Sequence, residues 1–326
     1  MGEHLGIIDS LSAGYRFLGY RFSLLLVPVL LDLFLWVGPR LSVAPLLDRV
    51  ANFYANAGTV EGMPAEMVDL SAEFSRILGE FSAGYNLMEF LVNSSMLHVP
   101  SIMVMTGPMP GAALIQISSV GVAFMVAIVL VAIGLLLGVF YMSLVARHLP
   151  IGHGPNTMTW PEFASSVFRN WLLLILLVVL LALFLVALYI PVSVGIALVA
   201  LVSPAFSSTL ALFLGLLSAL ILFFLYFVPV GLIMDSLPLR TAVVQSVQLV
   251  RGRFVTTLGF FLLTSLIMVG VGLILSNIAA FAPWGTISAI LLSAYLGTGL
   301  VMALMVFYRS QLLRLSEEVA LMNRRP

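Results

Sequence analysis

Long stretches of apolar residues are the feature that most constrains this chain. A helix needs roughly 20 apolar residues to cross the hydrocarbon of a bilayer, which is about 30 Å thick. Six stretches meet or approach that length, at residues 21–37, 118–145, 170–190, 208–234, 256–279 and 284–307. The first is short and contains Pro28 and Asp32. The third stays apolar beyond Pro191 to Val202, which predicts an extended helix that kinks and begins to turn at Pro191.

The composition argues against a soluble fold. Of the 326 residues, 62% are hydrophobic and only 9% are charged, whereas soluble domains carry roughly 25% charged residues. A soluble domain of this length could not bury so many apolar side chains. We therefore expect an all-α integral membrane protein, with residues 1–326 forming one membrane domain surrounded by lipid. The formal net charge is zero, so no nucleic-acid partner is expected.

The arginines predict the orientation of the chain. Cytoplasmic segments of membrane proteins carry an excess of basic residues. If the N-terminus is cytoplasmic, the cytoplasmic segments contain Arg16, Arg21, Arg147, Arg169, Arg240, Arg251, Arg253, Arg309, Arg314, Arg324 and Arg325. The other three arginines lie in segment 39–117, between the first two spans, together with seven Asp and Glu residues. We expect six crossings of the cytoplasmic (inner) membrane of a bacterial cell, with both termini in the cytoplasm.

An amphipathic pattern precedes the first, third and fifth spans. In segments 1–20, 148–169 and 235–254, apolar residues recur every three or four positions, which gives one apolar face along a helix. Each pattern leads into an arginine, an aromatic residue and an apolar run: Arg21 with Phe22, Arg169 with Trp171, and Arg251 with Phe254. This predicts three transmembrane hairpins, each preceded by a cytoplasmic interfacial helix. Alternatively, any helix that enters a membrane carries Arg and aromatic residues at the interface.

The two segments outside these hairpins are interpreted separately. In segment 39–117, stripes with helical spacing run from Val43 to Phe53 and from Met67 to Phe81, with acidic residues opposite. This predicts amphipathic helices on the extracytoplasmic side, which could cap the bundle, lie on lipid or bind a partner. Capping is the preferred interpretation. Residues 309–326 are expected to form a cytoplasmic tail.

Two acidic residues are candidates for structural or functional roles in the membrane. Asp32 lies inside the first span, where a carboxylate is costly unless it is protonated or paired, and Arg40 is a candidate partner. A structural role for Asp32 is favoured over a proton relay. Asp235 lies at the inner end of the fourth span, near Arg240, and is expected to be an interfacial ion pair or a helix-boundary residue.

Other motifs indicate packing rather than chemistry. Gly134 and Gly138 form a small-xxx-small face that permits close helix contact. The chain has no Cys, and His148 and His153 lie in a loop without a supporting ligand set, so neither a metal nor a cofactor is expected. It also lacks a phosphate-binding loop, a nucleophile elbow and a metalloprotease motif, so we expect no enzyme.

One motif resembles a known family. The stretch from Ala242 to Phe254 places Ser246, Leu249 and Arg251-Gly252 before a transmembrane hairpin. It resembles the membrane domain that is fused to some glycerophosphodiester phosphodiesterases, and related six-helix bacterial membrane families, mainly over residues 226–314. The resemblance implies a six-helix architecture. The catalytic domain of the fused proteins has no counterpart here, so their activity is not implied.

Three functions remain open from the sequence. The leading hypothesis is a non-catalytic accessory or scaffold subunit that packs against another membrane protein or against itself. The second is a binder or transporter of lipids or other apolar molecules, which requires a lateral opening in the interior. The third is a permease subunit of an ATP-driven transporter, which requires a cytoplasmic coupling helix.

Overall fold

The structure is a computed structural model that describes residues 5–19, 21–57, 65–94, 97–109, 111–149, 159–200 and 202–322. In this part of the chain, five helical segments are long and apolar enough to cross a membrane. They are α6 (Val120–Arg147), α7 (Trp160–Ala200), α8 (Pro204–Phe224) with α9 (Val228–Met234), α11 (Phe254–Ala279) and α12 (Trp284–Met322). The expected helical architecture with several potential spans is thereby confirmed, and a sixth potential span depends on the first, bent segment.

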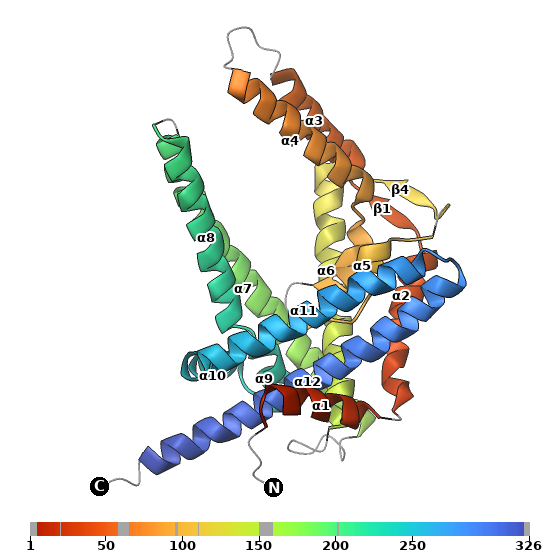
Figure 1. The fold of residues 1–326 in the computed structure, drawn as a ribbon, viewed down its shortest axis with the longest axis vertical. Coiled ribbons are helices and arrows are strands. Elements are labelled where there is room, and N and C mark those ends of the chain that lie inside the picture. The colour runs from red at the N-terminus through yellow and green to blue at the C-terminus, as the bar shows by residue number, and fades with distance from the viewer. Residues whose placement is uncertain are drawn as a thin grey trace.

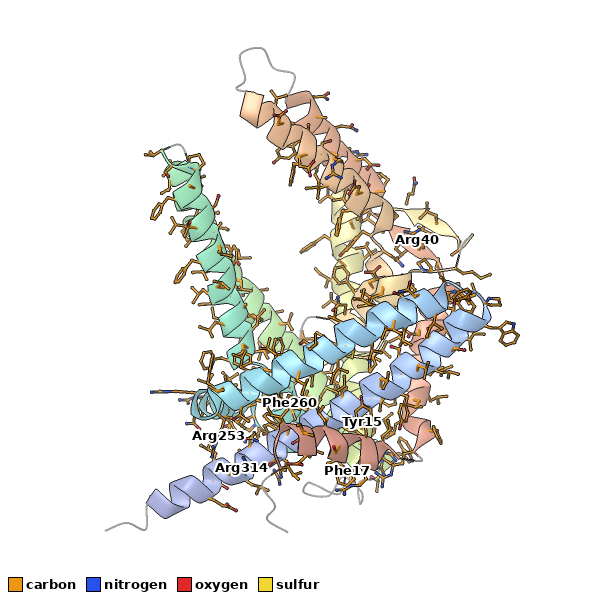
Figure 2. All side chains as sticks on the ribbon, in the orientation of Figure 1. Tyr15, Phe17, Arg40, Arg253, Phe260 and Arg314 are labelled. Carbon is orange, nitrogen blue, oxygen red and sulfur yellow. The ribbon has the colours of Figure 1, made fainter. Side chains whose placement is uncertain are left out.

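The first expected span, residues 21–37, consists of the 3-10 turn η1 (Phe22–Leu25) and α2 (Leu26–Val37). The helix expected before it is α1 (Ile7–Leu18), which is set at a bend of 100° to the span. α1 lies against α12, where a Cβ atom on Gly14 would come within 2.6 Å of the Ala303 backbone nitrogen. Its Tyr15 hydroxyl, labelled in Figure 2, donates to the carbonyl oxygen of Leu296 at 3.0 Å. α1 is therefore fixed to the protein by backbone contact.

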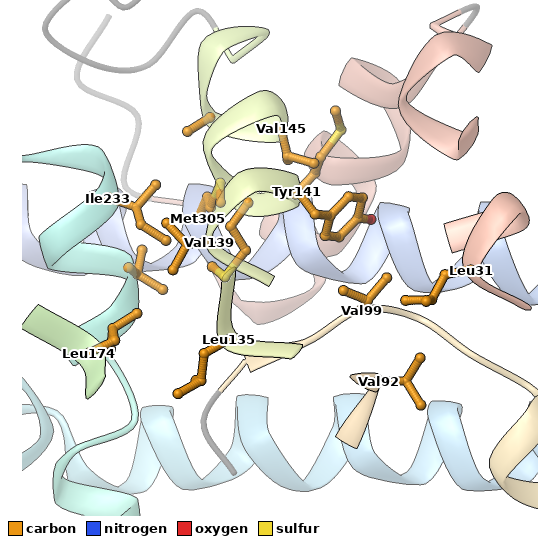
Figure 3. Packing of buried hydrophobic residues seen from close by; sticks show 14 of the residues in the cluster. Leu31, Val92, Val99, Leu135, Val139, Tyr141, Val145, Leu174, Ile233 and Met305 are labelled. Atoms are coloured by element: carbon orange, nitrogen blue, oxygen red, sulfur yellow. The ribbon is translucent and has the colours of Figure 1, made fainter. Parts of the chain in front are cut away.

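α12 is the central helix of the molecule. In its most apolar window, 67% of the residues are buried, against 11% in α7, so the other spans leave most of their apolar surface for lipid. The Phe260 ring of α11 stacks on Phe307 of α12 with centroids 4.2 Å apart. Tyr141 of α6 donates a 2.8 Å hydrogen bond to Thr298 of α12. Figure 3 shows the surrounding core, with Leu135, Val139, Tyr141 and Val145 of α6 and Met305 of α12.

α7 differs from the expectation at both ends. It begins at Trp160 and runs unbroken to Ala200, so residues 160–169 are its first turns and not a separate interfacial helix. Residues 150–158 of that expected segment lie outside the described chain. Pro191 lies inside the helix and does not end it. A proline inside a helix removes one backbone hydrogen bond. A turn within hydrocarbon would leave several N–H and C=O groups without partners, which costs more free energy.

The α7–α8 hairpin rises away from the rest of the molecule (Figure 1). Tyr189 and Ser218 hydrogen bond across it at 2.9 Å. At its base α8 ends at Phe224, the chain turns through three residues, and α9 resumes at Val228. α10 (Leu239–Gly252) follows as a separate helix within the segment 235–254. Residues 309–322 of the expected tail form the last turns of α12.

The segment 39–117 is partly helical and partly irregular. α3 (Ala44–Ala57) and α4 (Ala65–Gly84) form a hairpin that projects from the molecule in Figure 1. η2 (Leu87–Leu91), β2 (Asn93–Ser94), β3 (Leu97–His98) and α5 (Met103–Thr106) follow. β1 (Arg40–Ser42) pairs in parallel with β4 (Leu114–Gln116), a contact that the all-α expectation missed. Gly107 and Gly111 have φ values of +68° and +86°, which lets the chain reverse and return to β1.

Candidate functional site

An apolar cavity of about 620 Å³ is enclosed mainly by α8, α11 and α12. Ala219 and Leu222 of α8 form one wall, Phe261 and Met268 of α11 another, and Val301 belongs to the α12 side. No charged residue lines it among the residues that the structure describes. Ligand sites in proteins have volumes of roughly 300–1,000 Å³ and are mostly apolar. The cavity, defined by these walls, is thus large enough for a drug-sized molecule or a lipid chain.

The cavity opens sideways. Val269 and Leu222 in its walls are 52% and 41% exposed, whereas Phe260 and Val230 are 0% and 1% exposed and close its inner part. Figure 2 labels Phe260 near the base of the α7–α8 hairpin. The exposed wall residues lie on α8 and α11, which are both apolar enough to span a membrane. The residues at the mouth therefore belong to helices that are long and apolar enough to cross a membrane.

A few polar groups belong to this wall. Tyr226 contributes a hydroxyl to the wall, and the Thr264 hydroxyl donates to the carbonyl oxygen of Phe260 at 2.9 Å. Ser265 is a further hydroxyl-bearing residue in the lining. Hydroxyls that are already hydrogen-bonded to the protein add little polarity. The arrangement suits a molecule that is mainly apolar.

The break between α8 and α9 forms part of the cavity wall through Leu225 and Tyr226. Ser246 of α10 spans this break, because its hydroxyl donates to the Phe224 carbonyl oxygen at 2.7 Å and accepts from the Phe227 N–H at 3.2 Å. Non-helical backbone at membrane depth is tolerated where it borders a cavity and its polar groups find partners. Ser246, which the sequence identified only as part of a motif, therefore stabilises the wall of the cavity.

Asp32 is fully buried in α2 and accepts two hydrogen bonds from one distant segment. The Ser101 hydroxyl donates to Oδ1, and the Ile102 N–H donates to Oδ2 at 3.1 Å. The partners are thus different from the expected Arg40. Arg40 interacts electrostatically with Glu89 instead. Burial raises the pKa of the Glu89 carboxyl, and the positive charge of Arg40 partly offsets this rise. The structural role expected for Asp32 is consistent with this geometry.

Asp235 ends α9 and joins it to α12. Its carboxylate oxygens accept from Arg309 Nη1 and from the Tyr308 hydroxyl, both at 2.8 Å. Gln245 of α10 donates in turn to the Tyr308 hydroxyl at 3.1 Å. The expected position at a helix boundary agrees with the structure, but the ion-pair partner is Arg309 and not the nearby Arg240. Arg309 is 74 residues away, and only the fold brings it close.

Gly134 and Gly138 are both buried in α6. A Cβ atom on Gly134 would lie 2.4 Å from the carbonyl oxygen of Phe90 and 3.1 Å from Cα of Leu91. The close contact at Gly134 is therefore made with η2 of the same chain. This part of the small-residue face is already covered and does not need a partner helix.

The remaining motif residues do not meet in one site. Arg21 Nη1 donates to the His148 carbonyl oxygen, which ties the start of η1 to the end of α6. Trp171 Nε1 donates to the Ala132 carbonyl oxygen at 2.8 Å and ties α7 to α6. Phe22 and Phe254 are exposed on their helices, as are Arg169 and Arg251. Phe22 and Phe254 begin η1 and α11, whereas Arg169 and Trp171 lie inside α7, so the three motifs do not occupy equivalent positions.

The cavity itself was missed by the sequence reasoning, as was Ser101. Tyr226 and Pro229 inside a long apolar run indicate a break in the helix, but they do not indicate that a cavity lies beside the break. Groups of three or more His, Cys, Asp or Glu residues that could hold a metal ion are absent from the described residues, and His153 lies outside them. Comparison with models of protein families, with curated proteins and with solved structures gave no match.

Proposed function

We propose that this chain is a non-catalytic membrane protein that binds a lipid chain or a similar apolar molecule in the apolar cavity. The observation that carries the proposal is the cavity of about 620 Å³ with its lateral mouth. Of the three functions that the sequence leaves open, lipid binding is the one that requires such an opening. A lipid chain that enters from the bilayer exchanges one hydrocarbon environment for another, so contacts and shape decide its binding more than the hydrophobic effect.

Native mass spectrometry after gentle extraction tests this proposal. The unmodified chain should retain an apolar molecule that collisional activation releases. Ala219→Trp places a large side chain in the wall of the cavity and should abolish retention. Ala187→Trp is the matched control, because Ala187 is exposed on the neighbouring helix α7 and does not line the cavity. Absence of a bound molecule, or equal retention by both variants, would overturn the proposal.

An accessory subunit is the second candidate, and the α3–α4 hairpin favours it. Phe53, Phe74 and Phe81 are 69%, 41% and 53% exposed on this hairpin. Exposed aromatic groups of this kind mark surfaces that bind a protein or a membrane. The covered contact at Gly134 removes part of the support that the sequence offered for this function. A stoichiometric protein partner that is lost in Phe53→Ser and Phe81→Ser would favour it over lipid binding.

We also propose that both chain termini are cytoplasmic. Arginines lie near the C-terminal ends of α6 and α12 and near the N-terminal ends of α7 and α11, namely Arg147, Arg314, Arg169 and Arg253. If each of these helices crosses the membrane, these ends lie on one side, which supports the positive-inside assignment. A permease subunit would need a helix on this side that is free to couple to an ATPase. α1 is the first candidate for such a helix, but its buried face already lies against α12.

A further inference from the structure

A smaller cavity of about 100 Å³ adjoins the apolar cavity. The two cavities share wall residues, namely Met268, Val269, Gly297 and Leu300. The smaller one also reaches Ser101 and Ser293, which are absent from the lining of the larger one. A molecule that fills the apolar cavity can therefore place one end beside two hydroxyl groups.

The Ser101 hydroxyl is oriented by the protein. It donates its proton to Asp32 Oδ1 and accepts the Met103 N–H at 3.2 Å. A serine hydroxyl has one proton and two lone pairs, so one lone pair remains. Towards a ligand, Ser101 can act only as an acceptor. Asp32 fixes this role, because it is fully buried and its other oxygen already accepts from Ile102.

The Ser293 hydroxyl supplies the second observation. Ser293 is 8% exposed and lines the smaller cavity, and within the described residues its side chain makes no hydrogen bond. The Ser293 oxygen is not fully enclosed by protein atoms, so its hydroxyl is open to the smaller cavity with its hydrogen-bonding capacity unused. A ligand group in the smaller cavity would provide that partner.

We propose that the joined cavities bind a long-chain amphiphile whose small head group donates a hydrogen bond, as a fatty alcohol or a fatty amine does. The hydrocarbon chain occupies the apolar cavity, and the head group donates to Ser101 and bonds to Ser293. This inference rests on the proposed function and adds the chemical class of the ligand. A fatty acid anion is disfavoured, because the Ser101 hydroxyl offers it no proton and the Asp32 carboxyl stands directly behind.

Competition against a photoreactive hexadecanol tests the proposal. The full chain is reconstituted in nanodiscs, and the competitors are hexadecanol, hexadecylamine, hexadecyl methyl ether and hexadecane at equal mole fraction of lipid. The alcohol and the amine should compete about fivefold better than the ether, which cannot donate, because one neutral hydrogen bond corresponds to roughly that ratio. Crosslinked peptides should come from α11 and α12.

Variants separate this inference from the proposed function. Ser293→Ala should weaken competition by the alcohol and by the ether alike, because the oxygen of each loses the hydrogen bond from Ser293, while competition by hexadecane stays unchanged. The unchanged alkane also shows that the protein is folded. Ser288→Ala, on an exposed position of α12, should behave like the unmodified chain. Equal competition by alcohol and ether, or competition by the alcohol that Ser293→Ala leaves unchanged, would overturn the inference and leave apolar binding standing. Failure of every competitor, with no crosslink in the cavity, would overturn both.

Discussion

At the scale of single residues, the polar groups inside the membrane act by holding backbone segments in place. Neither hydrogen-bond partner of Asp32 is charged, and both its oxygens accept from the segment that contains Ser101 and Ile102. An amide in its place can still accept the Ile102 N–H and donate to Ser101, whose hydroxyl is able to turn. The side chain is thus needed mainly for the hydrogen bonds that it accepts.

This gives a prediction for Asp32. Asp32→Ala should lower the free energy of unfolding by about 2–4 kcal/mol, because two buried donors lose their acceptor. Asp32→Asn should cost less than half of that. Thermal unfolding of the purified protein in detergent measures both variants. A loss for Asn as large as for Ala would indicate instead that the negative charge itself is stabilising.

Ser246 offers a second test at this scale. Ser246→Ala removes the hydroxyl that satisfies both the Phe224 carbonyl and the Phe227 N–H at the break between α8 and α9. We expect a loss of about 1–3 kcal/mol in unfolding free energy, since these backbone groups lie away from water. Thr241→Ala, at an exposed position of the same helix α10, should change stability by less than about 0.5 kcal/mol. Equal effects of the two substitutions would contradict the assigned role.

At the scale of elements, α1 shows how an amphipathic helix becomes part of the core. Its pattern is that of an interfacial helix, and a helix of this type can lie on a membrane surface. In the structure Ser10, Ala13, Gly14 and Leu18 are buried, and the bend of 100° before α2 turns α1 across the molecule. The absence of a side chain at Gly14 allows the backbones of α1 and α12 to touch.

We therefore expect Gly14→Ala to weaken the attachment of α1 by about 1–3 kcal/mol, because its Cβ atom would meet the α12 backbone, which cannot move aside. Limited proteolysis should cut the N-terminal segment faster in this variant. Gly270→Ala is the control, since a Cβ atom at Gly270 in α11 has no other atom within 4 Å. Unchanged proteolysis in Gly14→Ala would mean that α1 is not held by this contact.

At the scale of the whole molecule, α12 organises the fold and the α7–α8 hairpin stands apart from it. The small buried share of α7 means that lipid, and not protein, covers most of this hairpin in a membrane. The cavity forms where the hairpin meets α11 and α12, because aromatic rings join the elements at the base. The ring centroids of Tyr226 and Phe261 are 5.5 Å apart, and those of Phe223 and Phe261 are 5.9 Å apart.

The proposed orientation is a prediction for the molecule as a whole. The chain contains no Cys, so any introduced cysteine is its only thiol. Ala72→Cys in α4 should react with a membrane-impermeant maleimide in intact cells, whereas Ser316→Cys in α12 should react only after permeabilisation. Both positions are exposed. The reverse pattern would place the termini outside. Labelling of both positions from one side would contradict the five crossings expected between them.

The sequence by itself determined the membrane class and the approximate positions of five spans. For α6 and α11, the expected and observed bounds differ by at most two residues, because the length of an apolar run is a local property. The tertiary structure decided the partners. Asp32 bonds to a segment 69 residues away, and Asp235 to an arginine 74 residues away, where nearer arginines had been expected. Which donors meet a carboxylate, and where helices fail to fill the space between them, depends on how distant elements pack. No local pattern contains that information.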